Sequence, residues 1–387
     1  MTQINFTVNF EELTQELLNC NLNQIVKSQL ITILNAYMEA ERDELVNVDA
    51  KAKTGNRQAV RNGYYERDFT IPIGRLNLKI PRTREGEFST KLFERYERMD
   101  QSLILMMIDS VVNGVSTRKV TKIVEAMGGE KVSKSFVSNA MKRLDPEIQE
   151  WSQRPLTHTN YQYLYVDAMY IKVRENHKVV PKAVYIAQGV TENGYRELIG
   201  FKISEEESHK AWSAFFSDLR NRGFSNPNLV ISDAHAGLKS AIQSQFLNVP
   251  WQRCTFHFLQ NMIKVMPKKN SEAERRVLRQ LFQASTIQHA REFRDEFFQL
   301  VSGRSKFDRA AEILEQGFDD ATQYFQFPQG HYKFIKSTNT LENINMQIRR
   351  REKVIRIFPN VDSAFRLIGS VLIDLSEKLE ETKRYLP

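Results

Sequence analysis

The amino-acid sequence predicts an α+β protein, in which a mixed αβ sheet follows a helical region with a β-hairpin and is itself followed by an all-α segment. Residues 161–204 predict the sheet, because they are rich in Val, Ile and Tyr and precede a helical segment and a further apolar strand. Residues 259–335 are polar and follow helical periodicity, which predicts an all-α segment after the sheet. Residues 67–82 predict the hairpin, because apolar and polar positions alternate around Gly74.

The composition is that of a globular protein with room for two or three domains. No apolar run approaches the roughly 18 residues of a membrane span, and the N-terminus does not resemble a secretory signal. The two cysteines, Cys20 and Cys254, lie far apart, which argues against a disulfide framework. We therefore expect a cytoplasmic protein with no membrane partner. Its net charge of +8 is compatible with a polyanionic partner.

The N-terminal segment begins with a helical pattern and continues into a basic stretch. Apolar residues between Leu13 and Leu34 recur at steps of three and four, which predicts a helix. Residues 51–67 contain five basic residues and one acid, together with the turn signals TGN and RNG. We expect a linker or extended arm here, with Arg57 and Arg61 available to DNA. The hairpin that follows is expected to have one apolar face and one basic face.

Residues 101–144 predict two short helices around a glycine turn. The first has an apolar stripe formed by Val120, Ile123, Val124 and Met127. Ser133 or Ser135 can cap the second helix. This arrangement is typical of a helix-turn-helix, although an ordinary helical hairpin in a core shows the same pattern. The second helix exposes side chains suited to a DNA major groove, namely Lys134, Ser138, Asn139, Lys142 and Arg143.

The order of elements after Tyr161 is three strands, a helix and a strand. Asn193-Gly194 forms a natural hairpin turn between the second and third strands. The helix carries Trp212, Phe215 and other apolar residues on one side. The final strand ends at Asp233, where the chain turns into a helix. This order predicts a mixed αβ sheet of the ribonuclease H-like type.

Two aspartates are placed where they can share a cation. Asp167 lies inside an apolar strand, where an ionised carboxylate is costly unless it is paired or binds metal. Asp233 lies at the end of a strand, where ligands gather in αβ sheets. On adjacent strands, the repulsion between the two carboxylates would be relieved by a hard divalent cation.

Glu342 is the candidate for a third carboxylate. It lies beside the apolar stripe of its helix, and Asn345 and Arg349 follow on the same face. Asn339-x-x-Glu342 also resembles a capping box, and the capping and ligand roles are compatible. Taken singly, each of the three carboxylates is more often a cap or a surface charge, so their combination carries the prediction.

The chain resembles the Mutator-type transposases of bacterial insertion sequences, a DDE transposase family. The resemblance covers nearly the whole length. The N-terminal segment RNGYYERDFTIPIGRLNLKIPRTREGEF resembles the leader region of the family. One departure is Leu341-Glu342-Asn343, where the family more often has an Ile-Glu-Arg type sequence. The remaining matching segments are VDAMYIKV around Asp167, VISDAHAGL around Asp233, WQRCTFHF from Trp251, and STNTLENINMQIRRR around Glu342.

The resemblance implies a ribonuclease H-like catalytic core interrupted by a helical insertion before the glutamate. The spacing from Asp233 to Glu342, 109 residues (342 − 233), leaves room for such a domain. We expect five regions along the chain. They are an N-terminal helical and β-hairpin DNA-binding or dimerisation region (1–95), a helix-turn-helix region (96–155), the first part of the core (156–258), the helical insertion (259–335) and the C-terminal core helices (336–387).

The family also has a Cys-x-x-His after the second aspartate, here Cys254 and His257. As a zinc site this pair lacks ligands, since four are usual. We expect a supporting role near the active centre, with Cys254 packed in the core. A purely structural histidine at His257 is an equal alternative.

The expected activity is DNA cleavage and strand transfer with two Mg²⁺ ions, for which Mn²⁺ can substitute. Asp167 would bridge the ions and Glu342 would bind the second. Water frees a 3′ hydroxyl, which then attacks another phosphate, so no covalent protein intermediate is needed. The expected partner is double-stranded DNA, both the terminal inverted repeats and the target, bound by a homodimer. Phosphate contacts are expected from Arg349, Arg350 and Arg351.

Two other functions fit the same residues. A ribonuclease H-like nuclease or resolvase would cut without joining, but it needs neither the long N-terminal region nor the insertion. A non-catalytic, sequence-specific DNA-binding protein would use the acidic residues structurally. The dependence of DNA binding on metal distinguishes this regulator from the enzyme, because a regulator binds its site equally well without magnesium.

Overall fold

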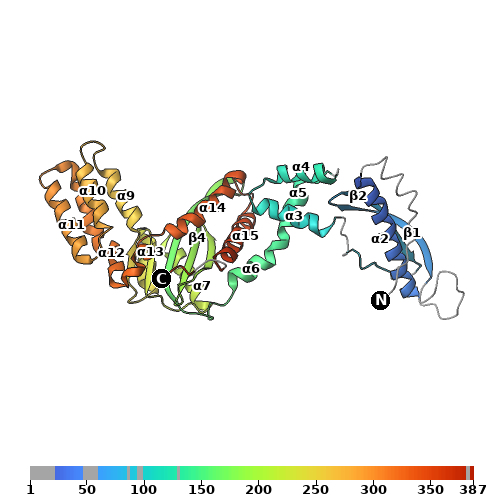
Figure 1. Ribbon diagram of the computed structural model, residues 1–387, viewed down its shortest axis with the longest axis horizontal. Helices are drawn as coiled ribbons and strands as arrows, with labels where there is room; N and C mark the ends of the chain where they lie inside the picture. The colour runs from blue at the N-terminus through green and yellow to red at the C-terminus, as the bar shows by residue number, and fades with distance from the viewer. Residues whose placement is uncertain (1–21, 47–59, 85–87, 94–98, 129–130, 381–383) are drawn as a thin grey trace. The chain divides into compact units, whose positions relative to one another are not determined.

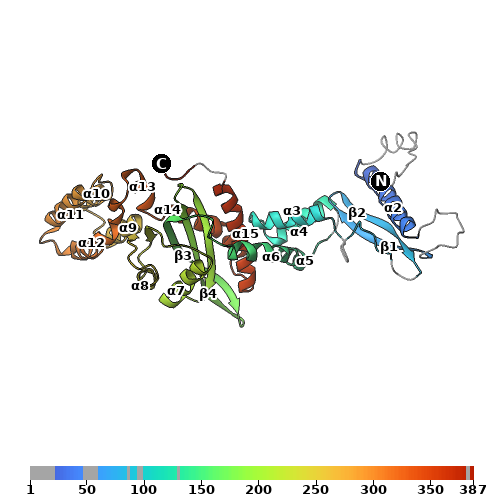
Figure 2. The ribbon, with the colours of Figure 1, turned by 90° about the horizontal axis from the view of Figure 1, so that it is seen from below.

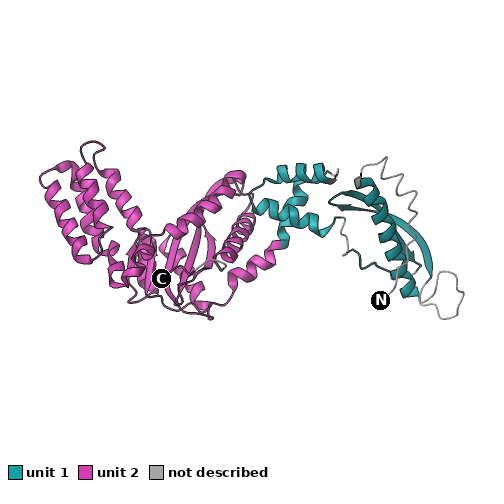
Figure 3. Cartoon of the chain, in the orientation of Figure 1, with its two compact units in different colours: residues 1–143 teal, residues 144–387 magenta. Residues whose placement is uncertain are grey.

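The protein is described by a computed structural model in which the chain forms two compact units, Met1–Arg143 and Leu144–Pro387 (Figures 1 and 3). Cys20, Arg57 and the predicted helical residues before Leu22 lie outside the described residues. The structure describes residues 22–46, 60–84, 88–93, 99–128, 131–380 and 384–387.

The first unit contains the predicted hairpin, packed on a helix. Strands β1 (Arg61–Ile71) and β2 (Gly74–Thr83) pair antiparallel. Their apolar face, with Leu76 and Leu78 fully buried, packs against helix α2 (Leu22–Val46). The alternation read from the sequence is therefore confirmed, because one face of the ribbon is buried.

Two details of this region differ from the sequence-based expectations. The RNG segment at Arg61 is not a turn in a linker, since it forms the irregular start of β1. The outer face of the hairpin is not uniformly basic, because the register places Glu66 opposite Lys79 and Asp68 opposite Asn77. Asp68 also pairs with Arg75. The outer face therefore carries mixed charge, and cross-strand neighbours of opposite charge stabilise it.

Three helices of the first unit contact one another: α3 (Gln101–Val112), α4 (Thr117–Gly128) and α5 (Lys134–Ala140). Ser133 is the cap of α5, and its hydroxyl accepts a hydrogen bond from the Phe136 amide at 3.1 Å. The predicted stripe of α4 is only half right, because Val120 and Val124 are buried whereas Ile123 and Met127 are exposed.

The second unit is built on a five-stranded sheet with the order β5-β4-β3-β6-β7. The first three strands along the chain are antiparallel neighbours, and β6 and β7 are parallel to β3. The strands are β3 (Tyr161–Glu175), β4 (Lys178–Thr191), β5 (Arg196–Ser204), β6 (Leu229–Ser232) and β7 (Trp251–Arg253).

One face of the sheet is covered by α7 (His209–Asn221) and α8 (Ala236–Gln245), whose apolar residues form one core with Leu164 and Val166 of β3. Because side chains alternate along a strand, Asp167, which follows Val166, points to the opposite face. Alternation along β3 thus separates the apolar core from the candidate site.

That opposite face is contacted by helices near the C-terminus. Helices α14 (Asn339–Ile355) and α15 (Val361–Glu380) contact β3, and α15 also contacts β5 (Figure 2). Helix α6 (Asp145–Gln153), which the sequence grouped with the helix-turn-helix, contacts α15 and β5 of the second unit. Ile355, the last residue of α14, is exposed.

The segment between the sheet and α14 is helical in the structure, as the sequence predicts. The expected strand from Trp251 to Phe256 is shorter, since β7 ends at Arg253 and α9 begins at Thr255. Among the described residues, no helix is both long and apolar enough to cross a membrane. The helices of the segment, most of which share a core, are α9 (Thr255–Val265), α10 (Glu272–Leu281), α11 (Ile287–Val301), α12 (Asp308–Ala321) and α13 (Tyr332–Ile335).

Candidate active site

The register of two parallel strands brings Asp167 and Asp233 together. Tyr165 of β3 pairs with Ile231 of β6, and each aspartate lies two residues further along its own strand direction. The predicted placement on adjacent strands is therefore what the structure has. Asp233 follows the carboxyl end of β6, where polar groups of an αβ sheet are free to bind ligands, and Asp167 lies beside it in the middle of β3.

Asp167 is a partly buried carboxylate with two hydrogen-bond donors. One oxygen accepts from the Ala168 amide at 2.8 Å, and the other accepts from the Asn345 side chain of α14 at 2.6 Å. Burial, reinforced by the negative charge of Asp233, raises the pKa of Asp167 to about 7. Asp167 therefore lies in surroundings that favour either a proton or a cation.

His257 lies between the other two carboxylates. Its Nδ1 atom is 2.7 Å from Asp233 Oδ1, and its Nε2 atom is 3.2 Å from Glu342 Oε1. The hydrogen bond to Asp233 is the main reason that the pKa of His257 rises to about 10. A protonated imidazole donates from both nitrogens, so His257 holds Asp233 and Glu342 on either side of one ring.

Glu342 reaches this cluster from the first turn of α14. The capping box expected from Asn339 and Glu342 does not form, because Thr338 is the cap residue and its side chain makes no capping hydrogen bond. The Thr338 hydroxyl instead lies 3.3 Å from Cys254 Sγ. The Glu342 carboxylate is thus directed to His257 and not to the backbone at the start of its own helix.

Cys254 joins the two helices that carry His257 and Glu342. It is fully buried, as expected, and precedes α9 directly. Its sulfur accepts from the Thr338 amide at 3.4 Å and from the Thr338 hydroxyl. Asp233, Cys254 and His257 offer ligand atoms within 4.8 Å of one another, but three ligands fall short of the four usual in a structural zinc site.

Asn345 contributes a side chain to the cluster, and the sequence did not predict its contact with Asp167. Its side-chain oxygen is buried and has no hydrogen-bond partner among the described residues. A buried acceptor without a partner is costly unless a cation or a water molecule binds it. Oxygen donors from Asn345, Asp167 and the neighbouring carboxylates form a set that suits a hard divalent cation.

A further acidic group next to the cluster was missed by the sequence reasoning. Glu207 is mostly buried, and burial raises its pKa. Its carboxylate accepts from Trp212 Nε1 at 3.2 Å and lies 3.4 Å from His235 Nδ1. His235 follows Asp233 by two residues in the segment VISDAH, so the histidine was visible, but its acidic partner depends on the tertiary fold.

The predicted DNA-contact residues fall into two groups. Arg349, Arg350 and Arg351 lie on α14, where Arg349 pairs with Glu352 at 3.3 Å and Arg351 donates to Gln347 at 2.8 Å. The second group lies in the first unit, where the Arg61 guanidinium is 2.9 Å from Asp43. The side chains Lys134, Ser138, Asn139, Lys142 and Arg143 are all exposed, the last two on a 3₁₀ turn after α5.

Comparison with known proteins identifies similar sequences along the whole chain. The family described as "Transposase, Mutator family" matches residues 1–382. The transposase for insertion sequence element IS256 in transposon Tn4001 of Staphylococcus aureus is 46% identical over 387 residues, covering 100% of this chain and 99% of that protein. The transposase for ISRM5 of Rhizobium meliloti is 36% identical, covering 92% and 88%, and that for IS1081 of Mycobacterium tuberculosis is 34% identical, covering 96% and 91%.

Proposed function

Because the chain belongs to the Mutator family of transposases, we propose that it cuts and joins DNA at a metal-dependent centre formed by Asp167, Asp233 and Glu342. The observation that carries this proposal is the convergence of three carboxylates from β3, the end of β6 and α14. They are separated by up to 175 residues (342 − 167) in the sequence. Carboxylates repel one another, so such a cluster is unfavourable unless positive charge offsets it.

The fold supports the proposal through its strand order. The sheet has three antiparallel strands followed by two parallel strands, with helices on both faces, and this order is compatible with the ribonuclease H-like core expected from the sequence. The first acidic residue lies on the first strand of this sheet and the second lies after the fourth strand. We assign the helices between β7 and α14 to the insertion of this core.

The donor set fits the expected Mg²⁺ ions, with Mn²⁺ as a substitute. Asp167, Asp233 and Glu342 offer oxygen ligands, and the unpaired oxygen of Asn345 is a further polar atom beside them. When bound, the ions supply activation of the attacking oxygen and charge stabilisation at the leaving oxygen. Asp167 has the central role, since it lies between Asn345 and the charge of Asp233.

His257 and Asn345 position the carboxylates. His257 hydrogen-bonds to Asp233 and forms an ion pair with Glu342, which fixes two side chains that come from different elements. Asn345 donates to one oxygen of Asp167 and the Ala168 amide donates to the other, so the two donors together hold this carboxylate in place. Cys254 supports both by joining the start of α9 to the residue before α14.

The substrate is double-stranded DNA, first at the terminal inverted repeats and then at the target. Water attacks at the transposon end and frees a 3′ hydroxyl, which attacks the target phosphate in the same site. The exposed residues of α5 read the repeats as the second helix of a helix-turn-helix, and Arg349, Arg350 and Arg351 contact phosphates. Two ends are cut together, so the acting form is a homodimer on DNA.

The test is cleavage and strand transfer on a labelled duplex that carries the element's end, with Mg²⁺, for wild type and Glu342→Gln. We expect Glu342→Gln to lose both products while DNA binding is kept. Glu315→Gln on the exposed face of α12 is the matched control and should cleave normally. Full activity of Glu342→Gln would exclude it from the centre, and wild-type nicking without joining would favour a nuclease.

A further inference from the structure

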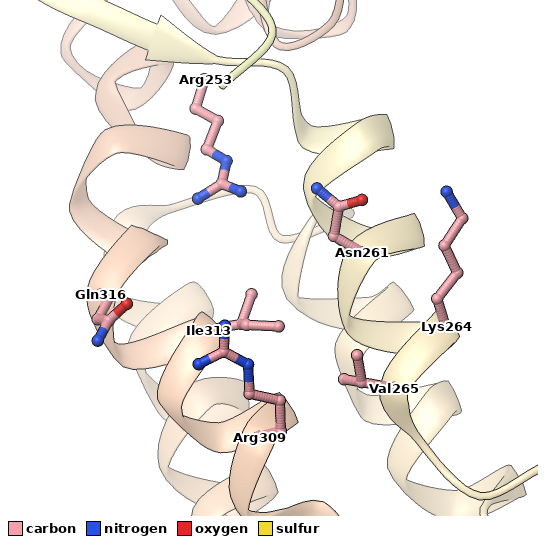
Figure 4. A pocket seen from close by; sticks show the side chains of 7 residues that line it. All are labelled: Arg253, Asn261, Lys264, Val265, Arg309, Ile313 and Gln316. Carbon is pink, nitrogen blue, oxygen red and sulfur yellow. The ribbon is translucent and has the colours of Figure 1, made fainter. Parts of the chain in front are cut away.

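A basic cavity lies between α9 and α12, one helix length away from the acidic cluster. Its volume is about 440 Å³, and its lining contains three cationic side chains, two amide side chains and no carboxylate from the described residues. Figure 4 shows Arg253 pointing from the end of β7 into the space between the two helices. Asn261 and Lys264 come from α9, and Arg309 and Gln316 come from α12.

Arg253 is held in place by packing, which leaves its charge for a ligand. Its guanidinium stacks on the Phe258 ring at 4.2 Å and makes no hydrogen bond or close ion pair with a described residue. Gly317 of α12 allows this stacking, because a Cβ there would lie 2.6 Å from both the guanidinium and the ring. The charges of Asp320 and Asp233 act on this half-buried guanidinium without a direct ion pair, so its N–H groups are left for an anionic ligand.

The other two cations are exposed at the mouth of the cavity. Lys264 has no ion pair with a described residue, and it is exposed on the outer face of α9. Arg309 pairs only with Glu312, three residues along α12, at 2.6 Å. A surface pair of this kind contributes little free energy, so a phosphate can compete for the guanidinium.

Helix α9 connects the cavity to the acidic cluster. His257, Asn261 and Lys264 recur at steps of four and three residues, so they share one face of the helix. At about 1.5 Å per residue, Lys264 lies roughly 10 Å along the axis from His257. In a duplex whose axis runs along α9, one strand rises about 3.4 Å per nucleotide, and this separation would correspond to about three nucleotides.

We propose that the cavity between α9 and α12 binds the sugar–phosphate backbone of DNA, about three nucleotides from the phosphate that reacts at the acidic cluster. Arginine binds phosphate oxygens through two N–H groups, lysine adds charge, and amide side chains donate further hydrogen bonds. None of these contacts reads a base, so the site positions the strand in a sequence-independent way. This inference rests on the proposed function, because it takes its distance from the reacting phosphate.

The test compares two double variants with equal loss of charge. Lys264→Gln/Arg309→Gln changes the exposed cations of the cavity and leaves the packed Arg253 intact. Arg276→Gln/Arg291→Gln changes two exposed arginines elsewhere on the helical insertion, on α10 and α11. Binding to a duplex of the element's end is measured by fluorescence anisotropy across a range of salt concentrations.

We expect the cavity variant to bind on the order of 10-fold more weakly at 0.1 M salt, with a salt slope smaller by about 1 to 2. The control variant should change less in both respects. Single methylphosphonate substitutions in the duplex then locate the contact. Wild type should lose affinity when the neutral linkage lies two to four nucleotides from the element's end, and the cavity variant should not respond to it.

Equal losses in the two variants, or a position dependence that persists in the cavity variant, would overturn the proposed contact. Cleavage by wild type on the same duplex with Mg²⁺ is measured in parallel. If wild type cleaves while the position dependence is absent, the cavity assignment fails and the proposed function stands. If wild type binds with the expected position dependence but never cleaves, the phosphate contact is kept and the proposed function fails.

Discussion

The acidic cluster and the cavity between α9 and α12 lie in the same unit but are built in opposite ways. The cluster gathers Asp167, Asp233 and Glu342 from distant segments, and a histidine and an amide from the protein hold them together. The cavity gathers cations from β7 and two helices, and aromatic packing holds the half-buried one. The first site concentrates negative charge, as the proposed cation binding requires, and the second concentrates positive charge, as the proposed binding of a DNA backbone requires.

Loss of a cluster carboxylate should have the largest effect. We expect Asp233→Asn to lower the cleavage rate by about 10³-fold or more, because it removes a ligand worth several kcal/mol to the transition state. Binding of the end duplex should change little. The measurement is single-turnover cleavage with Mg²⁺, with anisotropy on the same samples. A rate within 10-fold of wild type would remove Asp233 from the centre.

Loss of His257, which positions two carboxylates, should lower activity less than loss of a carboxylate. His257→Gln keeps a hydrogen-bonding side chain but cannot carry the positive charge between Asp233 and Glu342. We expect a loss of about 10- to 100-fold in activity or in apparent Mg²⁺ affinity, as is usual for groups that orient metal ligands. Higher Mg²⁺ should restore part of the rate. An unchanged Mg²⁺ dependence would indicate a structural histidine instead.

The metal-free protein should respond to pH through Asp167. Its pKa of about 7 in the folded protein exceeds the ordinary value of 3.8, so the folded state keeps a proton that the unfolded state has already lost. Stability from this group is present at low pH and is lost as pH rises towards 7. Asp167→Asn should therefore stabilise the metal-free protein at pH 8, by at most about 4 kcal/mol in the free energy of unfolding. This stabilisation is measured as a higher Tm. The same variant should lose cleavage. A lower Tm for this variant at pH 8 would contradict the raised pKa of Asp167.

The smallest effect is expected at the contact between Cys254 and Thr338. Thr338→Val removes the hydroxyl that donates to the sulfur and keeps the side-chain shape. We expect a loss of about 1 kcal/mol in the free energy of unfolding, which is typical of one hydrogen bond. Cleavage should fall only modestly, because Glu342 is still carried by α14. Denaturant unfolding provides the measurement, and an unchanged free energy of unfolding would contradict a stabilising contact here.

The sequence predicted those parts of the cluster that depend on local pattern. Strand alternation and strand ends are visible in the sequence, and they located Asp167 and Asp233 correctly on neighbouring strands. The helix of Glu342 was also predicted, but its capping box was wrong, because Thr338 is engaged by a cysteine 84 residues earlier. Such a contact depends on how distant segments pack, and no local periodicity encodes it.

The same limit explains the errors in the helical regions. Helical periodicity marked Ile123 and Met127 of α4 as core residues, yet only the neighbours at Val120 and Val124 are buried. Periodicity gives the apolar face of a helix, whereas its partner decides how much of that face is covered. The cavity at Arg253 was missed for a related reason, since its cations belong to a strand end and two helices.

The most direct test of the metal-dependent centre is a ligand substitution read out with two metals. Asp233→Cys replaces an oxygen ligand by a thiolate, which Mg²⁺ binds poorly and softer divalent ions such as Mn²⁺ bind better. The proposed function predicts that cleavage by this variant is lost with Mg²⁺ and at least partly restored with Mn²⁺. Two results would contradict a metal-binding role for Asp233. One is cleavage by the variant at the wild-type rate with Mg²⁺, and the other is an equal loss of cleavage with both metals.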